Sequence, residues 1–413
     1  MRAFKFFFFK LTVTAALVQC LSFSKSVAQE FLFPGKTKKD AISFSLIRNL
    51  VVIGVYINEK GPYNFILDTG VGPMILTDSA IVADMDVSKL RSIKISGLGQ
   101  GLEIEALLSN EVKARVGKSS ISFIPTAILK EDVLGLSNFV GMRISGLLGY
   151  HFFNSFLVRI NYSSKRLVFY RPDTGKKPKG ERVPITLFNN KPYTDIEVDI
   201  PGKGKIQAKV VVDNGASHAI SMETLDKIKF PVPEGAISAN LGIGLNGPIS
   251  GSIGRINSLK IGSYQFKNAI SAYPSYSAEI IKDFLTDRNG NLGADVLSRF
   301  NITFDYAGGA MYLQRNANFK RPFEHDMSGM EIYEEDDVEK RFFVNRVEPG
   351  SPAEIAGIKM GDELLNVNFS KAKITDLDLL NKLLRSGDGQ VLFFSLNRGG
   401  ELLVKLIKLK KRI

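Results

Sequence analysis

The feature that most constrains this chain is a short pattern that occurs twice. An apolar run ends in Asp68-Thr69-Gly70, and 145 residues farther along a second apolar run ends in Asp213-Asn214-Gly215. Three other segment pairs match in the same order and at nearly the same spacing: residues 115–117 with 260–262, 146–149 with 290–293, and 155–162 with 299–306. Repeated matches in one order indicate an internal duplication, in which each half contributes one aspartate.

In these residues the chain resembles a two-lobed aspartic protease of the pepsin and retropepsin kind. The second signature of that family, two apolar residues followed by glycine, is met by Leu147-Leu148-Gly149 and only partly by Asn291-Leu292-Gly293. The resemblance covers residues 43–316. It implies a catalytic pair, Asp68 and Asp213, supported by the other residues of the two turns, Thr69, Gly70, Asn214 and Gly215.

The segment after residue 320 has a different character. Gly350-Ser351-Pro352-Ala353, Ala356-Gly357 and Gly361-Asp362 follow one another between predicted strands. At this spacing they resemble a PDZ domain of the type attached to bacterial envelope proteases. The resemblance implies that peptide ends bind by strand addition. It points to the residues around the first predicted strand, Arg341, Phe342, Phe343 and Val344.

These observations predict a mainly β protein with two duplicated aspartic-protease-like lobes followed by an α+β PDZ-like domain. The predicted segments are a signal peptide at 1–28, lobe 1 at 43–172, lobe 2 at 180–316 and the PDZ-like domain at 322–410. A polar, basic linker at 172–180 contains another Asp-Thr-Gly, at Asp173. No apolar strand leads into it, so we interpret it as a turn.

The first 28 residues have the pattern of a secretory signal peptide. Arg2 and Lys5 precede a mostly apolar stretch, and Ser26-Val27-Ala28 offers a small-x-small cleavage site. A membrane anchor and a lipoprotein at Cys20 are the alternatives. Lys10 interrupts the apolar run, and Gln19 is not the small residue that lipidation needs. We therefore expect an exported chain, periplasmic or extracellular, without a disulfide in its mature form because Cys20 is the only cysteine.

Charge and composition exclude several other functions. The net charge of +12 comes partly from the lysine-rich linker and C-terminus, which favour solvated faces or surface association. No nucleic-acid module, phosphate loop or close spacing of metal ligands is present in the sequence. Ser217 and His218 are adjacent, so on a strand they would face opposite ways and would not form a serine triad. We predict no metal and no cofactor.

Three glycines in residues 96–101 interrupt the strand pattern of lobe 1. This segment, Gly97-Leu98-Gly99-Gln100-Gly101, lies where the family has a hairpin that covers the cleft as a flap. A plain flexible turn is the alternative.

The paired aspartates define the chemistry. Two carboxylates held close together share one proton; one then activates a water and the other polarises the scissile carbonyl. In the family a hydroxyl between Asp and Gly locks the pair across the lobes. Thr69 has this hydroxyl, whereas the longer amide of Asn214 is not expected to copy its geometry. Two functions follow: an exported aspartic endopeptidase whose PDZ-like domain engages substrate or partner peptides, or a catalytically silent peptide-binding relative.

Overall fold

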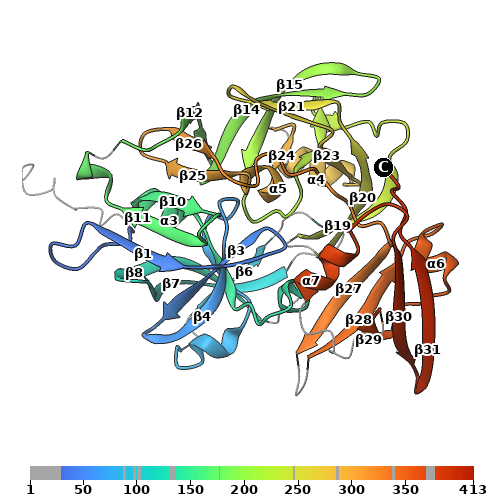
Figure 1. The fold of residues 1–413 in the computed structure, drawn as a ribbon. Coiled ribbons are helices and arrows are strands. Elements are labelled where there is room, and N and C mark those ends of the chain that lie inside the picture. Colours follow the sequence, from blue (N-terminus) through green and yellow to red (C-terminus); the bar gives the residue numbers. More distant parts are fainter. Residues whose placement is uncertain are drawn as a thin grey trace, which may run out of the picture.

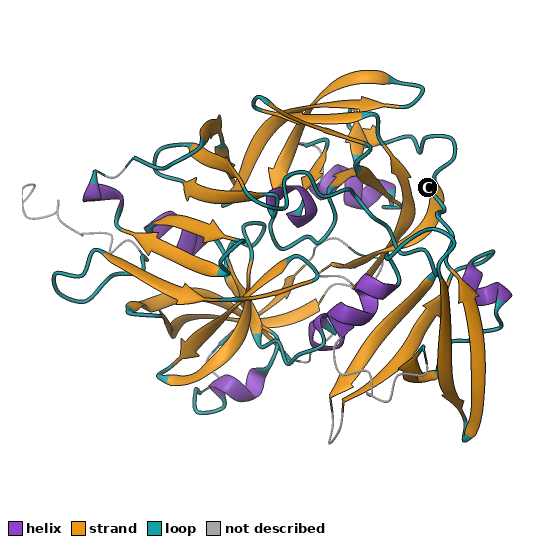
Figure 2. Ribbon diagram, in the orientation of Figure 1, coloured by secondary structure: helices purple, strands orange, loops and turns teal. Residues whose placement is uncertain are grey.

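The computed structural model describes residues 29–86, 90–95, 99, 104–130, 135–175, 177–244, 247–284, 288–336, 340–368 and 377–413. The predicted signal peptide lies outside these residues. Figure 1 shows two β lobes, blue to green and green to orange, and a smaller orange-to-red C-terminal domain beside them. Strands dominate all three parts, as Figure 2 shows. The predicted mainly β fold class is confirmed.

Lobe 1 is built on an eight-stranded sheet. Its order is β2 (Ser45–Ile47), β3 (Leu50–Ile57), β4 (Lys60–Leu67), β9 (Gly146–Leu148), β5 (Met74–Leu76), β8 (Ser119–Leu129), β7 (Ile104–Val116) and β6 (Arg91–Ile95). Strands β3 and β4 are joined by a tight turn. Asn58 and Glu59 both have positive φ there, which matches the right-handed twist of the hairpin. A short 3-10 helix, η1 (Ser79–Val82), follows β5.

Lobe 2 repeats these pairings in a ten-stranded sheet. Its order is β19 (Ile237–Gly244), β20 (Gly247–Arg255), β23 (Ile270–Pro274), β16 (Ile220–Met222), β24 (Gly290–Leu292), β15 (Gly204–Val212), β14 (Lys191–Ile200), β21 (Ser258–Ile261) and β22 (Tyr264–Lys267), with β13 (Thr186–Phe188) paired to β14. A two-stranded ribbon, β17 (Thr224–Leu225) and β18 (Ile228–Lys229), and helix α4 (Ala278–Phe284) complete the lobe.

A third sheet joins the lobes. Its order is β1 (Lys39–Ser43), β11 (Arg166–Tyr170), β10 (Leu157–Asn161), β25 (Phe300–Asp305), β26 (Ala310–Arg315) and β12 (Glu181–Pro184). The two lobes meet where Val158 pairs with Phe304. Because this sheet takes strands from both lobes, it fixes their relative position.

Short helices pack on the sheet that joins the lobes. Helix α3 (Tyr150–Ser155) follows β9 in lobe 1, and α5 (Ala294–Leu297) is its counterpart in lobe 2. Phe152 and Phe153 of α3 are fully buried, and the Phe153 ring lies 5.2 Å from that of Phe304. The core therefore runs continuously through both lobes.

The C-terminal domain has its own core and a five-stranded sheet. The strand order is β27 (Met330–Asp336), β28 (Lys340–Val347), β29 (Glu363–Val367), β30 (Val391–Arg398) and β31 (Glu401–Lys408), with helices α6 (Pro352–Ile355) and α7 (Leu377–Leu383). Ser351 caps α6, since its hydroxyl accepts a hydrogen bond from the Glu354 amide. Leu377 and Leu380 of α7 are buried in this core.

The strands that carry the two aspartates have matching neighbours. Strand β4 pairs in parallel with β9, so that Ile66 lies beside Leu147. Strand β15 pairs in parallel with β24, so that Val211 lies beside Asn291. Each aspartate thus follows the end of a buried central strand, and the two strands occupy equivalent positions in their sheets.

Candidate active site

Each aspartate is fixed by its backbone before its side chain is considered. The Asp68 amide donates to the Leu148 carbonyl at 2.8 Å, and the Asp213 amide donates to the Leu292 carbonyl at 2.9 Å. These bonds tie the ends of β4 and β15 to the short strands beside them. Both carboxyl groups are therefore held by the sheets rather than by free loops.

The two glycines allow the carboxyl groups to approach each other across the lobes. The Gly70 amide donates to Asp68 Oδ1 at 2.7 Å, and the Gly215 amide donates to Asp213 Oδ1 at 2.9 Å. A Cβ on Gly70 would lie 2.9 Å from Asp213 Cγ, and one on Gly215 would overlap the Asp68 carboxyl. Each carboxyl therefore packs against the turn of the other lobe, where a side chain would displace it.

Residues Thr69 and Asn214 bind the two turns to each other. Thr69 Oγ1 accepts from the Asn214 amide at 3.0 Å and donates to the Val212 carbonyl at 2.7 Å. In return, Asn214 Oδ1 accepts from the Thr69 amide at 2.8 Å, and its Nδ2 donates to the Leu67 carbonyl at 2.9 Å. Both side chains are fully buried.

The expectation that Asn214 could not copy the hydroxyl geometry was wrong. A hydroxyl accepts and donates through one atom, whereas an amide does so through two neighbouring atoms. Here the two atoms reach the same kinds of partner that Thr69 reaches in the opposite direction. The cross-lobe lock is therefore complete with one threonine and one asparagine.

Burial and the proximity of the two carboxyl groups favour a proton shared between Asp68 and Asp213. Burial raises the pKa of Asp68 well above its usual value, and the nearby Asp213 carboxyl raises it further through its charge. The Gly70 amide and the Lys191 ammonium oppose this rise. A protonated carboxyl beside another acid is the state that general acid–base chemistry on a bound water requires.

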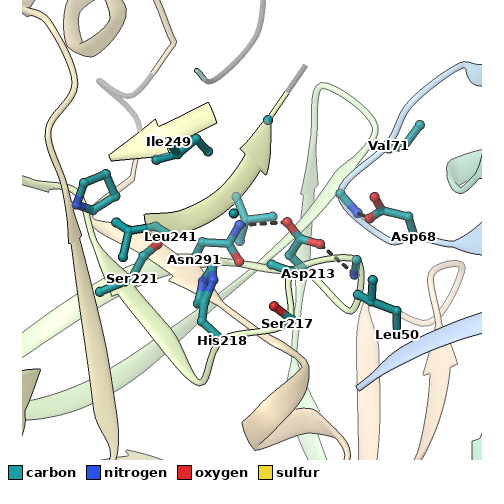
Figure 3. A pocket seen from close by; sticks show the side chains of 18 of the residues that line it. Leu50, Asp68, Val71, Asp213, Ser217, His218, Ser221, Leu241, Ile249 and Asn291 are labelled. Atoms are coloured by element: carbon teal, nitrogen blue, oxygen red, sulfur yellow. Dashed lines mark hydrogen bonds between the residues drawn. The ribbon is translucent and has the colours of Figure 1, made fainter. Parts of the chain in front are cut away.

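The dyad faces a cavity of about 300 Å³ that both lobes line. Lobe 1 contributes apolar side chains, among them Leu50, Ile66 and Leu147. From lobe 2, the β19–β20 hairpin brings Leu241 and Ile249 over the cavity, as Figure 3 shows. A peptide segment could be enclosed between these walls.

The predicted flap cannot be placed in full. Of its residues, Gly97, Leu98, Gln100 and Gly101 lie outside the described part of the chain. Gly99 is described and is buried. The hairpin that lines the described cavity is instead the glycine-rich one of lobe 2.

A charged wall on lobe 2 was not predicted from the sequence. Arg288 Nε lies 2.8 Å from Glu223 Oε2, and both side chains are almost fully buried. Ser221 donates to the other Glu223 oxygen at 2.9 Å. Lys191 lies on the same wall, and its burial lowers its pKa although both aspartates act in the opposite direction.

Two family models match parts of this chain. Residues 196–296, which include Asp213, match the family model for aspartyl protease, and residues 317–388 match that for the PDZ domain. The chain carries an aspartyl-protease domain and a PDZ domain. A retropepsin-like aspartic protease from Rickettsia conorii is 19% identical over 34% of this chain and 97% of its own, with a TM-score of 0.25. No curated protein matches the chain.

The PDZ domain corrects one prediction. Residues Arg341, Phe342, Phe343 and Val344 lie on β28, which pairs with β27 on one side and with β29 on the other. Phe342 is buried in the domain core. A peptide cannot add to a strand whose two edges are already paired, so these residues are not the site of strand addition.

The edge strands of the PDZ sheet are β27 and β31, and β27 lies against lobe 1. Helix α2 (Leu136–Val140) contacts it, and Arg48 Nη2 donates to the Ile332 carbonyl at 3.1 Å. Burial lowers the pKa of Arg48 to about 10. From lobe 2, Asn240 Nδ2 donates to Glu331 Oε2 at 2.8 Å. The PDZ domain is thus docked beside the protease cleft.

Among the described residues, no group of three or more His, Cys, Asp or Glu side chains is arranged to hold a metal ion. In the same residues, no helix is long and apolar enough to cross a membrane.

Proposed function

We propose that the chain is an aspartic endopeptidase that hydrolyses peptide bonds with Asp68 and Asp213. One observation carries this proposal: each carboxyl group packs against the turn of the other lobe, and four buried hydrogen bonds hold the two turns together. The aspartyl-protease and PDZ domains independently support a peptidase-type function.

The mechanism uses the pair as one unit. The charged carboxyl takes a proton from a water held between the aspartates, and that water attacks the scissile carbonyl carbon. The protonated carboxyl donates to the carbonyl oxygen, and a proton then passes to the leaving nitrogen as the C–N bond breaks. The lock matters because acid–base catalysis depends on the position of both groups.

One detail of the site bears on the alternative, a silent peptide-binding protein. That alternative rested on Asn214, whose side chain makes two of the four cross-lobe hydrogen bonds. The test is hydrolysis of a mixed peptide library from acidic to neutral pH by the mature chain. Cleavage supports the peptidase, whereas saturable peptide binding without cleavage supports the silent relative.

We also propose that the chain is exported and that its PDZ domain engages peptides. The signal-like pattern of residues 1–28 supports export to the periplasm or beyond, and N-terminal sequencing that finds Met1 retained would contradict it. Strand addition would use β27, which requires the PDZ domain to separate from lobe 1. Arg48→Ala removes one docking contact and should tighten binding of C-terminal peptides to the full chain.

A further inference from the structure

The two halves of the active site differ at one position next to the dyad. Leu147 lies beside the strand that leads to Asp68, and Asn291 lies beside the strand that leads to Asp213. The side chain of Leu147 can offer no hydrogen bond. Asn291 Nδ2 donates to Asp213 Oδ2 at 2.7 Å, and Figure 3 shows this side chain directed at the carboxyl.

Among the described residues, this bond gives Asp213 two N–H donors, whereas Asp68 has one. Asp213 Oδ1 accepts from the Gly215 amide at 2.9 Å, while its Oδ2 accepts from Asn291. Asp68 Oδ1 accepts from the Gly70 amide at 2.7 Å. Hydrogen bonds donated to a carboxylate favour its charged form. An amide NH₂ group also cannot accept, so a proton on Asp213 Oδ2 could not be directed at it, and the protonated oxygen would be a weaker acceptor for Asn291.

We propose that Asn291 is a positioning residue that makes Asp213 the charged member of the pair and leaves the shared proton on Asp68. This inference rests on the proposed function, and it assigns the roles of base and acid to the two aspartates. Asp213 is the base that receives the proton from the attacking water. Asp68 is the acid that donates to the carbonyl oxygen of the scissile bond.

The burial of Asn291 supports this role. Its side chain is almost fully buried, and its Oδ1 has no hydrogen-bond partner among the described residues. A buried amide with an unsatisfied oxygen costs stability that an apolar residue, as at Leu147, would not. The hydrogen bond from Asn291 to Asp213 offsets this cost.

Other groups around Asp213 act on it but do not divide the roles in this way. Those that interact with it from neighbouring elements are Asp68, Lys191, His218, Tyr276 and Tyr306, with the Glu223–Arg288 pair on the same wall. Burial favours the neutral form of His218 and of the two tyrosines. Lys191 acts on both aspartates. Substituting Asn291 leaves all of these groups in place.

The test is a carbon-13 NMR titration of the aspartate carboxyl groups in the full mature chain. Asp68→Asn and Asp213→Asn spectra assign the two signals. In Asn291→Leu the apparent pKa of Asp213 should rise relative to the parent by about 1 to 2 units, the range expected for loss of a hydrogen bond to a charged group.

One further variant serves as a control. Leu147→Asn supplies a donor on the other lobe and should lower the apparent pKa of Asp68 instead. Circular dichroism shows whether each variant folds.

The outcomes separate this inference from the peptidase proposal. An Asp213 value that is unchanged within about 0.3 units in folded Asn291→Leu overturns the inference. A fall would show that the amide oxygen faces Asp213, which also overturns it. The titration needs no turnover. A parent without peptidase activity whose Asn291→Leu variant shows the expected rise in the Asp213 pKa would therefore contradict only the peptidase proposal. In an active parent, the acidic limb of kcat/KM should move upward with the Asp213 value.

Discussion

Removing the side chain of Asn214 tests the cross-lobe lock most sharply. In Asn214→Ala, the Thr69 amide and the Leu67 carbonyl both lose their partner in a fully buried site. An unsatisfied buried polar group costs roughly 1–3 kcal/mol, so the two together should lower the free energy of unfolding by about 2–6 kcal/mol. Asn214→Thr restores an acceptor and a donor in one hydroxyl and should stay within about 1 kcal/mol of the parent.

Urea unfolding followed by far-UV circular dichroism measures these changes, since the chain has no tryptophan to report them by fluorescence. A matched control is Asn316→Ala. The Asn316 side chain also makes two backbone hydrogen bonds, to Ser298 and Asn318, but both lie within lobe 2 and the residue is only partly buried. The control should cost less and leave the titration of the dyad unchanged.

Two results would refute the reasoning about the lock. Asn214→Ala could lose less than about 1 kcal/mol with an unchanged urea dependence, in which case the four bonds do not hold the lobes together. Alternatively, Asn214→Thr could be as unstable as Asn214→Ala. The amide would then make a contact that no hydroxyl can replace.

Three other substitutions give independent predictions. Arg288→Met leaves the Glu223 carboxylate buried and unpaired, and should cost about 3–5 kcal/mol in urea unfolding. A loss below about 1 kcal/mol would contradict the ion pair. Lys191→Met removes a cation that lowers the pKa of Asp68, so the alkaline limb of kcat/KM should move to higher pH; a downward shift would refute this sign. Because the pKa of Asp68 is raised in the folded protein, its protonation contributes stability. This contribution is fully present below the unfolded-state pKa of about 3.9, and it is lost as the pH rises through the pKa of Asp68 in the folded state. Asp68→Asn should therefore gain stability relative to the parent toward neutral pH, and an equal difference at every pH would exclude Asp68 as the cause.

The aspartates and their glycines could be predicted because the Asp-x-Gly pattern occurs twice in the chain. An apolar strand ending in Asp-x-Gly is a local pattern, and its second copy at a fixed spacing makes the pairing explicit. The role of Asn214 could not be predicted in the same way. Whether an amide fits depends on the separation of the two turns, which is set by the sheet that joins the lobes.

Other parts of the site depend on contacts between residues far apart in the sequence. Glu223 and Arg288 meet only because the elements that carry them fold together on lobe 2. Asn291 was visible as a departure from the apolar signature, but its bond to Asp213 follows from the parallel register of β15 and β24. Lys191 had no local signal at all.

The PDZ error has a simple physical cause. The alternation in residues 330–334 was a usable strand signal that the sequence analysis did not assign. Without β27, the next strand looked like the edge of the sheet. Strand order depends on tertiary pairing, so predicting the domain type did not identify which strands lie at the edges of the sheet.

Turnover by the single-aspartate variants is the most direct measurement of the central claim. The mature parent, Asp68→Asn and Asp213→Asn would be compared on one cleaved library peptide from acidic to neutral pH. Each variant should lose about 10²–10⁴-fold in kcat, because either change removes the shared-proton pair. A folded variant of either kind that keeps the activity of the parent would show that hydrolysis does not proceed through Asp68 and Asp213 together.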